Sequence, residues 1–89
     1  MSHHLSVLKA IFQEPVSANI HWREIESLLH RLGAKIEPSH GARFRVVLNQ
    51  IEFFLHHPHH GNEFSKQDIK QLREHLVKAG IGASSLESE

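Results

Sequence analysis

The chain has 89 residues, of which 39% are hydrophobic and 22% charged, which indicates one small globular domain and excludes a disordered chain. It contains no cysteine, which excludes disulfides and thiolate metal sites, and no apolar run approaches the roughly 18 residues of a membrane span. Ten Lys and Arg balance ten Asp and Glu, so nucleic-acid binding is expected to be local and to strengthen below about pH 6.5, where the ten histidines gain charge.

Two helices are predicted in the first third of the chain. The first, over residues 6–13, has apolar residues at helical spacing and ends near Pro15. Asn19 is a suitable N-cap for the second, over residues 20–32, and Gly33 ends it because glycine accepts the left-handed conformation. The apolar stripe of the second helix consists of Trp22, Ile25, Leu28, Leu29 and Leu32.

Three strands are predicted in the middle of the chain. Residues 34–37 form a weak first strand, and residues 43–48 and 51–56 form a hairpin closed by Asn49-Gln50. Period-two alternation predicts a core face that consists of Phe44, Val46, Leu48, Ile51, Phe53 and Leu55. The opposite face, here called the open face, then carries Arg43, Arg45, Val47, Glu52, Phe54 and His56.

A last helix is predicted from its N-cap, Ser65, to Gly80, which ends it. Its expected core residues are Ile69, Leu72, Leu76, Val77 and Ala79. The order of elements predicts an α+β fold: a three-stranded antiparallel sheet with two helices packed on one face, plus a short N-terminal helix. We expect residues 1–18 to form the N-terminal helix and its connector, residues 19–82 the α-β-β-β-α domain, and residues 83–89 a disordered tail.

Four histidines surround Pro58 where the last predicted strand ends, and they are His56, His57, His59 and His60. Because imidazole titrates near neutral pH and binds metal ions, this corner is the first candidate for a site. A solvated loop without a function is one alternative, and His57 and His60 are interpreted as solvent-facing. A zinc or nickel site at His56 with His59 or His60 is another, but no well-placed fourth ligand completes it, so neither a functional metal nor another cofactor is expected.

The other imidazole and indole side chains on the predicted helices are interpreted as structural. Trp22 is expected in the core. His21, His30 and His75 are expected on helix surfaces, without a special role.

Several short motifs occur in an order that resembles a known family. Leu28-Leu29 is similar to the end of its first helix, and Gly41-Ala42-Arg43 falls where the family has Gly-Ser-His. The segment from Pro58 to Phe64 is similar to its exit from the last strand, and Arg73 to Ile81 to its closing Leu…Ala-Gly-Ile. From about His21 to Ile81 the chain resembles the HicA-like mRNA interferase toxins, whose fold is similar to the double-stranded-RNA-binding domain.

The absence of cysteine favours a cytoplasmic protein. The resemblance implies a toxin that cleaves mRNA without a metal ion and has an antitoxin as its protein partner. Such cleavage needs a base for the ribose 2′-hydroxyl, an acid for the leaving oxygen and a cation at the phosphate. His59 best matches the family histidine as proton carrier, with His56 as an alternative, His40 as second carrier and Arg43 as phosphate clamp. Arg43 stands where the family has its catalytic histidine, and arginine is a poor base, so a non-catalytic RNA-binding or protein-interaction module is the alternative.

An RNA-binding surface is predicted on the open face and at the start of the last helix. Its expected contact residues are Arg43, Arg45, Phe54, His56, Lys66 and Lys70. Arginines and an aromatic ring on one sheet face combine phosphate contact with base stacking. The two lysines lie one turn apart where the helix dipole also favours phosphate. The alternatives are an ordinary solvated face and a face covered by a partner protein or a second copy.

Overall fold

A computed structural model describes residues 3–16, 20–58, 61–82 and 85. Its elements in chain order are α1 (His3–Phe12), β1 (Ile20–His21), α2 (Trp22–Arg31), β2 (Lys35–Pro38), β3 (Arg43–Leu48), β4 (Ile51–His56), β5 (Glu63–Phe64) and α3 (Lys66–Lys78). The predictions for His59 and His60, and for the 83–89 tail apart from Ser85, concern residues outside this description.

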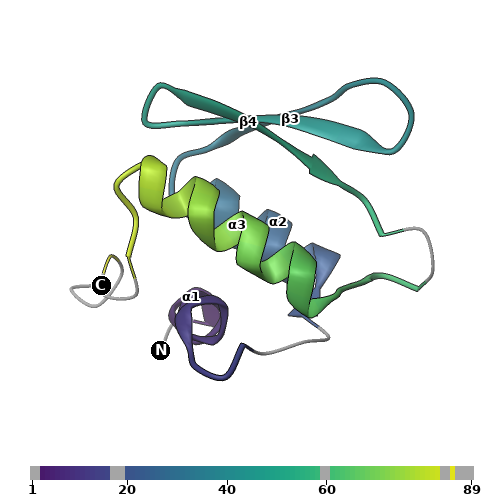
Figure 1. The fold of residues 1–89 in the computed structure, drawn as a ribbon. Coiled ribbons are helices and arrows are strands. Elements are labelled where there is room, and N and C mark those ends of the chain that lie inside the picture. Colours follow the sequence, from purple (N-terminus) through teal and green to yellow (C-terminus); the bar gives the residue numbers. More distant parts are fainter. Residues whose placement is uncertain (1–2, 17–19, 59–60, 83–84, 86–89) are drawn as a thin grey trace.

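The elements form layers, with a sheet at one side of the molecule and α1 at the other (Figure 1). Strands β2, β3 and β4 make an antiparallel sheet in that order. Helices α2 and α3 cover one face of this sheet, and α1 packs against both helices on the side away from the sheet. The predicted α+β fold, with two helices on one face of a three-stranded antiparallel sheet, is therefore confirmed.

The β3–β4 hairpin has the predicted alternation of core and open faces. Val46 lies opposite Phe53, and Phe44 lies opposite Leu55. The Val46, Phe53 and Leu55 side chains are buried, as period-two patterning requires of the face turned towards the helices. The open face of the hairpin carries no helix from the described part of the chain.

The hairpin turn has the backbone that a tight two-residue connection needs. Asn49 and Gln50 both have positive φ, 51° and 70°, which is typical of a type I′ turn whose twist matches that of the flanking strands. Asn49 Nδ2 also donates a hydrogen bond to the carbonyl oxygen of Ala79, at 2.8 Å. Because Ala79 is the C-cap of α3, this bond joins the tip of the hairpin to the end of that helix.

The start of the second helix differs from the prediction. Helix α2 begins at Trp22, and the two residues before it form β1, in which Ile20 pairs with Phe64 of β5. His21 is the N-cap: its Nδ1 accepts from the Arg23 N–H at 3.1 Å, and its own N–H donates to the Glu24 carboxylate at 3.1 Å. The predicted cap at Asn19 and the predicted surface role of His21 are therefore wrong, because a two-residue strand is too short to leave a periodic signal.

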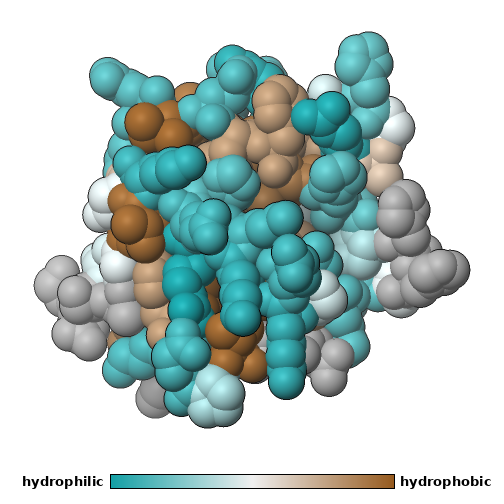
Figure 2. Space-filling view, viewed as in Figure 1, coloured by the Kyte–Doolittle hydropathy of each residue, from teal (hydrophilic) through white to brown (hydrophobic). Residues whose placement is uncertain are grey.

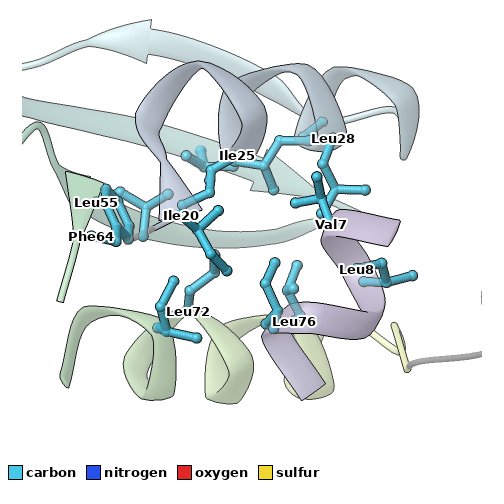
Figure 3. Close-up of a cluster of buried hydrophobic side chains, with 14 of the residues drawn as sticks. Val7, Leu8, Ile20, Ile25, Leu28, Leu55, Phe64, Leu72 and Leu76 are labelled. Carbon is cyan, nitrogen blue, oxygen red and sulfur yellow. The ribbon is translucent and has the colours of Figure 1, made fainter. Parts of the chain in front are cut away.

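The core lies between the layers and receives side chains from all three helices (Figure 3). Val7 and Leu8 of α1, Leu28 of α2 and Leu76 of α3 are buried within it. The adjacent Val77 was predicted in the core but is 58% exposed, because it lies on the outward face of α3. That outward surface over α3 is mainly hydrophilic (Figure 2), as expected of a solvated helix face.

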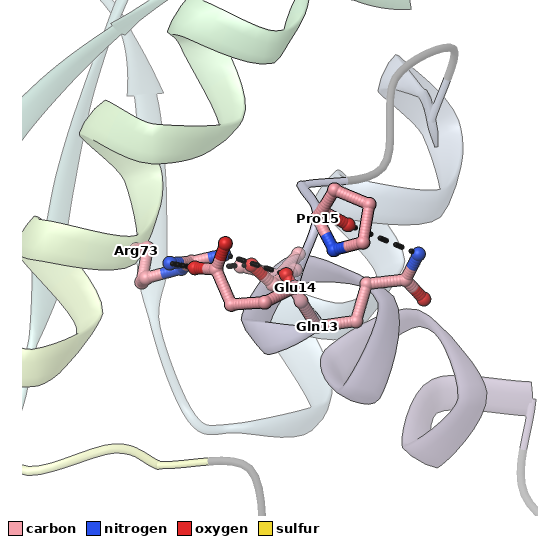
Figure 4. A network of polar contacts seen from close by, with 5 residues as sticks. Gln13, Glu14, Pro15 and Arg73 are labelled. Atoms are coloured by element: carbon pink, nitrogen blue, oxygen red, sulfur yellow. Dashed lines mark hydrogen bonds and ion pairs between the residues drawn. The ribbon is translucent and has the colours of Figure 1, made fainter.

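Arg73 of α3 holds the C-terminal end of α1 (Figure 4). Its Nε donates to the Ile11 carbonyl oxygen and one Nη donates to the Gln13 carbonyl oxygen, both at 3.0 Å, while the other Nη pairs with the Glu14 carboxylate. The last carbonyls of a helix have no partner within the helix, so the guanidinium satisfies groups that α1 cannot satisfy alone.

His75 of α3 packs between the helix and the sheet. Its ring stacks on Phe53 of β4, with centroids 4.6 Å apart and planes inclined by 6°. Burial lowers the pKa of His75 from its ordinary value, the nearby Lys78 lowers it further, and Glu74 opposes the shift. The prediction of a surface histidine without a role is therefore wrong.

Replacing Arg73 by Met should lower the free energy of unfolding by about 1–3 kcal/mol, because the variant leaves the α1 carbonyls without their charged donor. Urea unfolding measures this change. The matched control is Glu14→Gln, which removes only the exposed ion pair and should cost less than about 1 kcal/mol. Equal losses in the two variants would show that the carbonyl contacts contribute nothing.

Acidification should destabilise the protein through His75. Its folded-state pKa lies below the unfolded value of 6.5, so the unfolded chain binds the proton more readily. The contribution of His75 is therefore fully present above about pH 6.5 and is lost as the pH falls through the lowered pKa. His75→Phe should reduce the stability loss between about pH 7.5 and 5.5. An unchanged slope, or the same change from the exposed control His30→Gln, would contradict this.

Candidate nucleic-acid interface

One end of the sheet gathers the turn before β3 and the exit from β4. Arg43 at the start of β3 lies opposite His56 at the end of β4. Within the turn, the Arg43 N–H donates to the His40 carbonyl oxygen at 3.2 Å. The His57 N–H donates to the Ala42 carbonyl oxygen at 2.7 Å, so a backbone bond ties the histidine corner to the Gly41-Ala42-Arg43 turn.

Arg43 is exposed on the open face, where its guanidinium lies over the Phe54 ring, 4.6 Å from the centroid. This cation–π contact orients the guanidinium and leaves its N–H edge available for hydrogen bonds. Among the described residues no carboxylate pairs with Arg43. Its positive charge is therefore available to an external anion.

Arg45 lies two residues further along the same face but is engaged within the sheet. It pairs with Glu37 of β2 at 2.9 Å and with Glu52 of β4. The hydrogen bond with Glu52 and the charges of both carboxylates raise the pKa of Arg45. Two carboxylates offset its charge, so Arg45 connects the three strands and attracts a phosphate less than Arg43 does.

The two histidines at the strand exit point to opposite sides. His56 is exposed on the open face, opposite Arg43. His57 is half-buried on the helix side, with its ring centroid 5.6 Å from that of Trp22 and 6.5 Å from that of Phe44. The interpretation of His57 as solvent-facing is therefore wrong. Extending the β4 alternation by one residue beyond His56 would have placed His57 on the side of the core.

Trp22 is the centre of an aromatic cluster beneath this corner, and its predicted core position is confirmed. Its ring stacks on Phe44 at 5.1 Å and on Phe64 at 5.8 Å between centroids. The backbone N–H of Trp22 also donates to the Asn62 carbonyl oxygen at 2.6 Å. The start of α2 thus contacts the sheet, β5 and the histidine corner together.

The remaining predicted site residues lie in different places. His40 is exposed in the β2–β3 turn, at the same end of the sheet as Arg43. Lys66 and Lys70 are exposed on the first turns of α3, in the helical layer, so the fold does not bring them onto the open face. His59 lies outside the described residues. The described residues contain no group of three His, Asp or Glu placed to hold a metal ion.

No helix in the described part of the chain has the length and apolar character required to cross a membrane. Residues 22–81 match the sequence model of the family described as "HicA toxin of bacterial toxin-antitoxin". No curated protein and no solved structure gives a significant match. The family match covers more than half of the chain, and its description implies an antitoxin as the partner. The chain therefore belongs to the HicA toxin family of bacterial toxin–antitoxin systems.

Proposed function

We propose that this protein is a toxin that binds mRNA at the Arg43 end of its sheet and cleaves it without a metal ion, until an antitoxin covers that surface. The observation that carries the proposal is the pairing of Arg43 with Phe54, next to His56, on a face that no described element covers. Membership in a toxin family makes RNA a more reasonable ligand for this surface than an unrelated anion.

Each of these groups has a plausible task in RNA binding. The Arg43 guanidinium can form two parallel hydrogen bonds to a phosphate, and single-stranded bases stack on aromatic rings such as that of Phe54. His56, on the same face, adds a ring nitrogen that can donate a hydrogen bond to the RNA. Arg45 contributes less than its position suggests, because Glu37 and Glu52 engage it. Lys66 and Lys70 would extend the path of the RNA along the helical layer.

Cleavage would use two imidazoles. His59 is the proposed base for the 2′-hydroxyl, and His40 the proposed acid for the leaving oxygen. Arg43 would stabilise the negative charge that develops on the phosphate. His40 supports this assignment by its position, since its backbone carbonyl accepts from the Arg43 N–H.

Binding without cleavage is the second candidate function. Arg43 occupies the position at which the resemblance places a catalytic histidine. Its guanidinium stacks on Phe54, which suits a group that binds a phosphate. Arginine keeps its proton at any physiological pH, so it cannot replace a base. A protein with these residues could hold mRNA and still leave it intact.

Arg43→Ala should weaken binding of single-stranded RNA and lower the slope of log K against log salt by about one, because one phosphate contact is lost. Titrations of a labelled RNA between about 50 and 200 mM salt measure both quantities. The control is Lys35→Ala, which removes an exposed cation from β2 and should have a smaller effect. Equal effects of the two variants, or affinity independent of salt, would exclude the proposed interface.

Cleavage should persist in EDTA and fall strongly in His59→Ala and His40→Ala, because proton transfer and not a metal ion drives the reaction. Gel analysis of mRNA incubated with each folded variant gives the rates. Binding of RNA without cleavage by the wild type would establish the second candidate function. Full activity of His59→Ala would reject only the assignment of that residue.

A further inference from the structure

Both the ring and the backbone of His57 make contacts with other parts of the fold. Its ring meets the Trp22 ring edge-on, with the planes inclined by 61°, and also lies against Phe44. Its backbone N–H is bonded to Ala42, next to Arg43. Backbone and ring are therefore both constrained at the end of the sheet where the proposed RNA site lies.

The two ring nitrogens of His57 have different environments. Nδ1 lies 3.0 Å from the carbonyl oxygen of Pro58. A carbonyl can only accept, so Nδ1 carries a hydrogen in the neutral and in the charged ring. Nε2 has no hydrogen-bond partner among the described residues, and it alone changes from acceptor to donor when the ring gains a proton.

The described surroundings of His57 provide no anion to pair with its charged form. Trp22 and Phe44, which pack on the ring, are uncharged. On α2, the Glu24 carboxylate already accepts from the N–H of the His21 cap, and Arg23 is exposed. Near the turn and strand ends stand three further groups that are cationic or can become so: His40, Arg43 and His56. Glu63 lies opposite His21 in the β1–β5 pair.

We propose that His57 is a further RNA-binding residue, whose Nε2–H donates to a phosphodiester oxygen when the ring is charged. The inference rests on the proposed function and extends the interface around the end of the sheet, from Arg43 on the open face to the helix side. A phosphate suits this position because, among the described residues, no carboxylate pairs with the His57 ring and Nε2 has no hydrogen-bond partner.

Trp22 is the only tryptophan of the chain, so its fluorescence reports on this histidine. A charged imidazole in contact with an indole quenches its emission. We expect emission to fall on acidification in the wild type and in the matched variant His56→Gln. In His57→Gln the emission should depend much less on pH. Because phosphate stabilises the charged ring, addition of RNA should move the midpoint of quenching to higher pH.

The test uses the full chain and a short single-stranded RNA with 2′-O-methyl groups, which binds but cannot be cleaved. His57→Gln should weaken its binding roughly tenfold near pH 6 and much less near pH 8, the change expected for one charged hydrogen bond. If the wild type binds RNA but the midpoint does not move, or if His57→Gln binds equally well, the role of His57 is rejected alone. If the wild type does not bind RNA at any pH, the proposed function fails as well.

Discussion

The packing of the Trp22 ring against Phe44 and Phe64 is the contact on which the arrangement of this molecule depends. It joins the start of α2 to the sheet on one side and to β5 on the other. Since β5 leads into α3, the same ring fixes how both helices meet the sheet. The His57 ring lies against this cluster, so its position follows from a hydrophobic contact and not from polar bonds alone.

Much of the fold can be predicted from the sequence, because its longer helices and strands have periodic patterns of apolar residues. The alternation in β3 and β4 identified the buried Val46 and Phe53, and the capping residue Ser65 located the start of α3. Patterns failed where an element is too short or depends on distant residues. Two-residue strands show no period, and His21 becomes a cap only because Ile20 pairs with Phe64. The prediction that Val77 is in the core was wrong because Val77 lies one position beyond the buried Leu76, where the helix surface turns towards solvent.

The sequence predicts which residue types occur at the candidate site, but it does not predict the contacts that each of these side chains makes. Composition identifies arginines on one face of the sheet, yet nothing local in the sequence says that Glu37 and Glu52 engage Arg45 while Arg43 stays free of carboxylates among the described residues. That difference comes from strand register, which places Glu37 opposite Arg45 across β2 and β3. For His57 the core side follows from the β4 alternation extended by one residue, and only its contact with Trp22, distant in sequence, needs the folded chain.

The hydrogen bond from Asn49 to Ala79 makes the two ends of the sheet unequal. The hairpin tip is fastened to α3, whereas the opposite end holds the turn before β3 and the exit from β4. Changes of length or composition in the exposed turn before β3 can therefore accumulate without breaking the bond at the tip. The fastened tip thus leaves the exposed turn before β3 free to vary.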